Sequence, residues 1–153
     1  METLEAMIKE HPFWAELDSK YLRLLNECGT LESYSAGQQI FQEGAEASRL
    51  YLIQTGYVSV ETLVPNRGLV TIQLLGPGEA LGWSWLFSPT TFKFSARALD
   101  VTQTIVFDAV MLRGKMEENH DFGYEMLTRM TNMILQRMHA TRQQLLDLQS
   151  GQS

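Results

Sequence analysis

The chain has 153 residues, of which 44% are hydrophobic and 20% charged, a composition typical of one globular domain with a buried core. Its net charge of −6 argues against binding to nucleic acid, because that affinity comes mainly from neutralising phosphates with basic side chains. The single cysteine, Cys28, excludes an internal disulfide and a cysteine metal cluster. There is no signal peptide and no apolar run of about 20 residues that could span a bilayer, so we expect a cytoplasmic protein without a membrane partner.

Residues 1–28 are predicted to be helical. Hydrophobic residues recur there at helical spacing in two stretches, which Pro12 separates. Asp18 is a good N-cap for the second helix, and Gly29 is expected to end it. We interpret Cys28 as a small buried apolar residue without special reactivity.

Residues 29–107 change to short strands separated by turn residues. The predicted strands cover residues 50–53, 57–60, 70–75, 96–99 and 104–107. Gly56 and the stretch 65–68 supply turns between them. Several short strands at close spacing predict a β-roll, sandwich or barrel.

Helix is expected to return over residues 108–149. Asp108 is predicted to cap a first helix that runs through Met116, and Asp121 to cap a second that runs to about Leu148. The second helix would be about 40 Å long, since each residue adds about 1.5 Å.

The hydrophobic residues of this last helix follow a heptad repeat. Leu127, Ile134, Thr141 and Leu148 fall at one position, and Thr131, Met138 and Leu145 at the other. A seam over three heptads predicts pairing with the same helix of a second chain, and hence a homodimer. The alternative is that the seam packs on the chain's own β-region. We expect both, with pairing between chains in the half beyond Arg137.

Four methionines and the three histidines are also candidate functional residues. Met126, Met130, Met133 and Met138 are interpreted as core residues rather than as an adaptable binding surface. His11, His120 and His139 are scattered and have no metal-ligand partner at useful spacing. We interpret them as surface residues or hydrogen-bonded structural residues, and we expect neither a metal nor a cofactor.

Several segments of the chain occur in an order that is typical of a known family. They read YSAG (34–37) and QIFQEG (39–44), LYLIQTG (50–56) and VSV (58–60), LGPGE (75–79) and LG (81–82), and RALD (97–100). In this order they resemble the sensor domain of the catabolite activator/Fnr family. The first two segments are similar to the first hairpin of that domain. The resemblance implies an α+β fold: a β-roll of the double-stranded jelly-roll type with N-terminal helices and a long C-terminal dimerisation helix. It also implies a non-enzymatic regulatory role in signal transduction.

The residues that hold the nucleotide in that family are altered here. The family presents the N-terminal amides of a short helix to a cyclic phosphate, binds the ribose with a glutamate and pairs the phosphate with an arginine beside a Ser or Thr. In this chain Trp83 stands at the glutamate position. Alignment on residues 97–99 puts Phe92 at the arginine position and Lys93 at the Ser/Thr position, whereas alignment on residues 95–96 puts Phe94 at the arginine position. Both alignments replace the arginine by phenylalanine.

An aromatic ring cannot neutralise a phosphate, and an anion buried without its partner costs several kcal/mol. We therefore expect a sensor of a small molecule other than cAMP, which signals through the homodimer helix to a partner protein. The resemblance places the altered ligand pocket at Gly82, Trp83, Ser84, Phe92, Lys93 and Thr141. Thr141 matches a family position that contacts the nucleotide base.

Two further hypotheses keep the same fold. In the first, the aromatic residues Trp83, Trp85, Phe87, Phe92 and Phe94 fill a pocket that has lost its ligand, and the chain is a dimeric interaction scaffold. In the second, Lys93 replaces the arginine as a point charge and a cyclic nucleotide still binds.

Two other function classes are disfavoured. A cupin-type enzyme needs clustered histidine ligands, and residues 31–107 contain no histidine. A DNA-binding transcription factor of the resembled family carries a helix-turn-helix after the long helix, and the five residues 149–153 are too few for one. We therefore expect no catalytic residues and no direct binding to nucleic acid.

Overall fold

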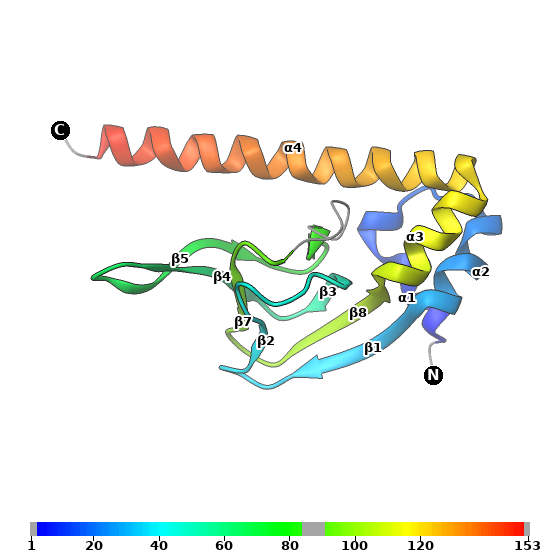
Figure 1. Cartoon of the computed structure of the whole chain (residues 1–153), viewed down its shortest axis with the longest axis horizontal. Coiled ribbons are helices and arrows are strands. Elements are labelled where there is room, and N and C mark those ends of the chain that lie inside the picture. Colours follow the sequence, from blue (N-terminus) through cyan, green and yellow to red (C-terminus); the bar gives the residue numbers. More distant parts are fainter. Residues whose placement is uncertain (1–2, 84–90, 152–153) are drawn as a thin grey trace. The chain divides into compact units, whose positions relative to one another are not determined.

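The computed structural model describes residues 3–83 and 91–151 of the chain. They divide into two compact units, Met1–Lys115 and Met116–Ser153. The first contains the N-terminal helices and both sheets, and the second contains the long helix α4 (Figure 1). The helices are α1 (Leu4–Glu10), η1 (Pro12–Trp14), α2 (Ser19–Cys28), α3 (Ala109–Glu118) and α4 (His120–Ser150). The strands are β1 (Gly29–Tyr34), β2 (Gln39–Phe41), β3 (Arg49–Thr55), β4 (Val58–Val64), β5 (Gly68–Leu75), β6 (Ala80–Leu81), β7 (Ser95–Ala98) and β8 (Thr102–Asp108).

The predicted N-terminal helices are confirmed. Pro12 opens the short 3-10 turn η1 between α1 and α2. Asp18 caps α2, because its side chain accepts the Lys20 N–H at 3.1 Å. Gly29 ends α2 in an extended conformation, with φ −102°, and begins β1 directly.

Two four-stranded antiparallel sheets form the β-roll, which confirms the predicted α+β fold. Their strand orders are β1-β8-β3-β6 and β2-β7-β4-β5. The hairpin expected over residues 34–44 is wrong, since β1 pairs with β8 and β2 pairs with β7. The two turns predicted there are present, with φ of +86° at Gly37 and +90° at Gly44. The chain therefore crosses from one sheet to the other between β1 and β2.

The core has two layers because β3 is buried on both of its faces. On the outer face of the first sheet, the ring of Phe107 meets Trp14 of η1 edge-on, with centroids 5.6 Å apart. On the inner face, Tyr51 and Ile53 join a hydrophobic cluster between the sheets. The other members of this cluster are Phe41, Ala47, Val58, Val60, Leu75, Leu81, Phe92, Ala96 and Val106. The roll is thus filled by side chains from both sheets.

Of the two N-caps predicted for the C-terminal helices, one is confirmed and one is wrong. Asp108 caps α3 by accepting the Met111 N–H at 2.9 Å, as expected, but α3 continues to Glu118 rather than ending at Met116. The prediction that Asp121 caps α4 is wrong. Asn119 is the N-cap, and its side chain accepts the Phe122 N–H at 3.1 Å. Asp121 instead lies in the first turn of the helix, where a carboxylate is favoured by the helix dipole.

We predict that Gly56→Ala destabilises the roll far more than Gly37→Ala. Both glycines have positive φ, +92° and +86°, so an alanine at either position costs about 1 kcal/mol of backbone strain. A Cβ at Gly56 would also lie 2.4 Å from Thr102 Oγ1 and 2.6 Å from the Val101 carbonyl oxygen, whereas nothing lies within 4 Å of one at Gly37. Urea unfolding should show a loss of about 3 kcal/mol or more for Gly56→Ala. Equal losses in the two variants would contradict the close approach of Gly56 to the backbone at Val101 and Thr102.

Candidate functional site

Gly82 begins the segment in which the sequence predicts a ligand pocket. It follows β6 with φ +89°, and a Cβ there would lie 2.5 Å from the carbonyl oxygen of Arg49 and 3.1 Å from the ring of Tyr51. The close approach of this backbone to β3 therefore requires glycine whether or not a ligand binds.

Phe92, which stands at the expected arginine position, is buried inside the roll. It is 3% exposed, and its ring stacks on Phe41 of β2 with centroids 3.8 Å apart and planes inclined by 15°. Phe94 is half-buried, and its ring centroid lies 5.8 Å from that of Phe41. Side chains from β2 and from the segment before β7 thus form an aromatic group at the position where the family's arginine is expected from the sequence.

Backbone hydrogen bonds fix Phe92 in this place. Its N–H donates to the Ala45 carbonyl, and its own carbonyl accepts the Gly44 N–H, both at 2.9 Å. An isolated bridge also joins Thr91 to Glu46. The residues that follow the expected phosphate-binding segment are therefore tied to the loop between β2 and β3.

The remaining predicted residues of this segment have different surroundings. Lys93 is exposed, so it lies on the surface while the neighbouring Phe92 is buried. Trp83 is half-buried, and its indole N–H is buried without an acceptor among the described residues. Ser84 lies outside the described residues, as do Trp85 and Phe87.

The two arginines on the described strands, Arg49 and Arg97, are paired with carboxylates. Arg49 Nη1 donates to Glu32 at 2.9 and 3.2 Å, and Arg97 pairs with Glu61 at 3.3 Å while also donating to the Gly37 carbonyl. Burial is the largest single effect on the pKa of Arg49 and lowers it, but the charges of Glu32 and Tyr51 and the hydrogen bonds to both together raise the pKa above its ordinary value. Neither guanidinium is available to a ligand anion unless its carboxylate moves away.

Two buried tyrosines extend this network into the roll. Tyr34 donates its hydroxyl to Glu32 at 3.0 Å, and burial raises its pKa well above the ordinary value. Burial also raises the pKa of Tyr51. Both hydroxyls therefore stay protonated at neutral pH, and Tyr34 donates to Glu32 whereas Tyr51 accepts a hydrogen bond from Arg49.

Cys28 and the histidine of the N-terminal segment behave as structural groups. The Cys28 thiol is buried, and burial raises its pKa to about 11, so it is not a nucleophile near neutral pH. This confirms the sequence interpretation. His11 is buried and hydrogen-bonded, which fits one of the two alternatives left open for it.

Helix α4, described by itself, changes character along its length. Phe122, Met126, Met130 and Met133 are buried, but every residue from Met138 to Ser150 is exposed. The expectation that Met138 is core is therefore wrong, since it is 59% exposed. Thr141 is also exposed on this helix, in a different unit from Phe92.

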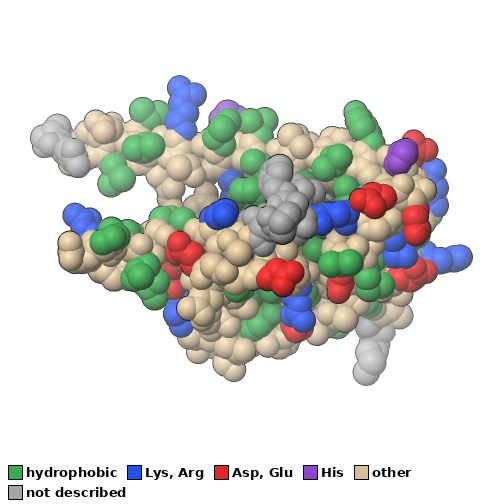
Figure 2. All heavy atoms as spheres, in the orientation of Figure 1, with side chains coloured by type: hydrophobic (Ala, Val, Ile, Leu, Met, Phe, Trp, Pro, Cys, Tyr) green, Lys and Arg blue, Asp and Glu red, His purple; other side chains and the backbone are tan. Residues whose placement is uncertain are grey.

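Most residues of the predicted heptad seam are exposed on α4, and four of them are large hydrophobic residues. Leu127, Met138, Leu145 and Leu148 are between 48% and 65% exposed, Thr131 and Thr141 are exposed, and Ile134 is half-buried. Figure 2 shows hydrophobic side chains at intervals along the surface of this helix.

Sequence reasoning missed Phe41 and Arg49 as parts of this region. Phe41 belongs to a strand of three residues, too short to give a periodic signal, and its stacking on Phe92 joins residues 51 positions apart. Arg49 and Glu32 pair across the intervening strand β8, which only the sheet order reveals.

Over the described ranges, no group of three or more His, Cys, Asp or Glu side chains could hold a metal ion. In the same ranges no helix is both long and apolar enough to cross a membrane.

Solved structures with the same fold include bacterial cyclic nucleotide-binding proteins. A cyclic nucleotide-binding domain from Methylobacillus flagellatus matches with a TM-score of 0.83 at 22% identity, covering 94% of this chain and 83% of that one. A putative cyclic nucleotide-binding protein from Geobacter metallireducens matches with a TM-score of 0.80 at 24% identity, covering 90% of this chain and all of that one. At these identities the likeness establishes the fold alone.

Sequence comparisons add relatives that are longer than this chain. The CRP-like cAMP-activated global transcriptional regulator of Mycobacterium tuberculosis is 24% identical over 115 residues, which are 75% of this chain and 50% of that protein. Glutaminase 2 of Bradyrhizobium diazoefficiens is 36% identical over 73 residues, which are 48% of this chain but 11% of that protein. The chain thus spans half or less of the length of these two relatives.

The family model of the cyclic nucleotide-binding domain matches residues 31–119, more than half of the sequence. The chain belongs to the cyclic nucleotide-binding domain family.

Proposed function

We propose that the chain is a non-enzymatic regulatory sensor that responds to a small molecule other than cAMP and acts as a homodimer through α4 on a partner protein in the cytoplasm. Family membership supports the regulatory role, and the buried Phe92 carries the argument against cAMP. A cyclic phosphate needs a cationic partner when it is taken out of water, and a phenylalanine stacked at 3.8 Å on Phe41 provides none.

Neither of the neighbouring cations replaces the missing arginine without rearrangement. Lys93 is exposed, so it would have to turn inward past the hydrogen bonds that hold Phe92. Arg49 would have to leave Glu32. An uncharged or aromatic effector suits the aromatic surroundings better than a cyclic nucleotide does.

The exposed half of α4 supports the proposed homodimer. At 1.5 Å per residue the 31-residue helix is about 46 Å long, and its last 13 residues are all exposed. Exposed apolar residues that repeat every three and four positions are typical of a coiled-coil seam. Pairing of two copies would cover Met138, Leu145 and Leu148 together.

A thermal-shift screen with cAMP, cGMP, cyclic dinucleotides and a metabolite panel tests the sensor. An effector at about 100 times its Kd stabilises the protein by about 2.7 kcal/mol, which raises the Tm by about 5–10 °C. We expect no shift with cAMP or cGMP and a shift of this size with at least one metabolite. A saturable shift with cAMP would overturn the exclusion, and a panel without any shift would favour the scaffold without a ligand.

We predict that Phe92→Ala reduces the free energy of unfolding by about 3–5 kcal/mol, because it removes a fully packed ring. Phe94→Ala is the matched control, since Phe94 is only half-buried, and its loss should be about 1–2 kcal/mol. Denaturant unfolding at neutral pH measures both. Similar losses in the two variants would show that Phe92 is not the ring on which the packing of the roll interior depends.

We predict that Leu145→Glu gives a monomer, because it puts two charges opposite each other in the seam. Gln136→Glu introduces the same charge at an exposed position of α4 outside the seam and should leave the dimer intact. Sedimentation equilibrium should report twice the 17.4 kDa mass of the chain for the wild type and the control. A wild-type monomer, or a dimer that survives Leu145→Glu, would contradict the proposed interface.

A further inference from the structure

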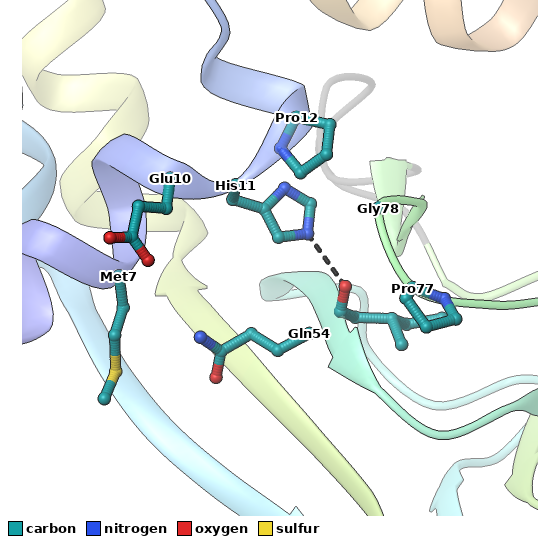
Figure 3. Close-up of a pocket in the computed structure, with 8 residues that line it drawn as sticks. Met7, Glu10, His11, Pro12, Gln54, Pro77 and Gly78 are labelled. Atoms are coloured by element: carbon teal, nitrogen blue, oxygen red, sulfur yellow. Dashed lines mark hydrogen bonds between the residues drawn. The ribbon is translucent and has the colours of Figure 1, made fainter. Parts of the chain in front are cut away.

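His11 lies in a small cleft between the N-terminal helical segment and the roll (Figure 3). The cleft has a volume of about 230 Å³. Met7 and Glu10 line it from the N-terminal side, and Ile53, Gln54 and Gly78 line it from the roll. The imidazole itself is only 5% exposed, although the cleft brings solvent close to it.

The two hydrogen bonds of His11 define its protonation state. Nδ1 accepts the Phe13 N–H at 3.1 Å, so this nitrogen carries no proton. Nε2 lies 2.8 Å from the Ile53 carbonyl oxygen, and because a carbonyl only accepts, Nε2 must donate. The imidazole is therefore neutral, and a second proton on Nδ1 would face the Phe13 N–H donor and break that bond.

The Ile53 carbonyl connects His11 to the turn before β6. It also accepts the Gly78 N–H at 3.0 Å, and Pro12 lies against Gly78, 3.4 Å from the place of a Cβ. This turn continues through β6 to Gly82 and Trp83. The imidazole thus holds three parts together: the start of η1, strand β3 and the turn that leads to the candidate site.

Among the described residues, the carboxylates near the cleft form no ion pair with His11 and are not among the causes that shift its pKa. Glu10 is exposed on the helical side, and Glu79 is exposed in the turn, where its carboxylate accepts the Gly76 N–H. Burial is the main cause that lowers the pKa of His11, and its hydrogen bond to Ile53 opposes this only in part. A buried imidazolium without a paired carboxylate is costly, so protonation favours a conformation in which the ring leaves the cleft.

We propose that His11 is a pH-sensitive latch, which in its neutral form joins the N-terminal helical segment to the turn before β6 and on protonation opens this junction. The proposal does not depend on which ligand the roll binds. Because the pKa is lowered in the folded state, the stabilisation is fully present above the ordinary histidine pKa of 6.5 and is lost as the pH falls below it.

Amide hydrogen exchange at pH 7.5 and 5.5 tests the latch, with each rate divided by the intrinsic exchange rate at that pH. One pH unit below 6.5, opening that frees a histidine becomes about tenfold more favourable. In the wild type we expect the corrected rates of the Phe13 and Gly78 amides to rise by about this factor. The Gly37 amide, which donates to the Ala98 carbonyl elsewhere in the roll, should not change.

Two variants distinguish a pH dependence caused by His11 from one caused by another titrating group. His11→Asn keeps an acceptor near the Phe13 N–H, and His11→Gln keeps a donor that can reach the Ile53 carbonyl, but neither side chain titrates. In both variants the Phe13 and Gly78 rates should no longer depend on pH. Wild-type rates that do not depend on pH, or the same rise in the variants, would overturn the proposal. The wild-type measurement stays decisive even if one variant fails to fold.

Discussion

The stacking of Phe92 on Phe41 is the contact on which the candidate site depends. It places inside the roll the aromatic ring that the sequence predicts at the family's arginine position, and the hydrogen bonds to Gly44 and Ala45 hold the backbone on either side. The nearby strand arginines are bound to Glu32 and Glu61. In the part of the chain that the structure describes, the interior of the roll is therefore apolar, which is the basis for the proposed change of ligand class.

The rest of the first unit holds this interior in place. The first sheet packs on the second sheet through its inner face and on η1 through its outer face, and close backbone approaches at Gly56 and Gly82 fix the adjoining turns. His11 attaches the N-terminal segment to the same region through Ile53. Helix α4 is different, because its last 13 residues are all exposed, and we propose that a second copy of the chain covers them.

Local signals in the sequence predicted much of this architecture. Asp18 and Asp108 cap helices as expected, because a cap is a hydrogen bond within three residues and needs no knowledge of the fold. The same logic failed at α4, where Asn119 and Asp121 are both good caps and only the backbone decides between them. The exposure of Met138 and the separation of β1 from β2 depend on long-range packing and pairing, which short windows do not contain. For the site, a phenylalanine in place of the family's arginine stays a prediction from the sequence, and the stacking of Phe92 on Phe41 could not be predicted because it joins distant segments.

The most direct test of the altered site is an NMR titration of the ¹⁵N-labelled protein with cAMP, in which the amide signals of Gly44, Gly82 and Phe92 are followed. These amides border the aromatic interior, so a nucleotide bound there must change their chemical shifts. We expect no saturable change at any of the three up to millimolar cAMP, because Arg49 and Arg97 are paired with carboxylates and Lys93 is exposed. Saturable shifts of these three signals would contradict the account, since they would show that the roll accepts a cyclic phosphate despite Phe92.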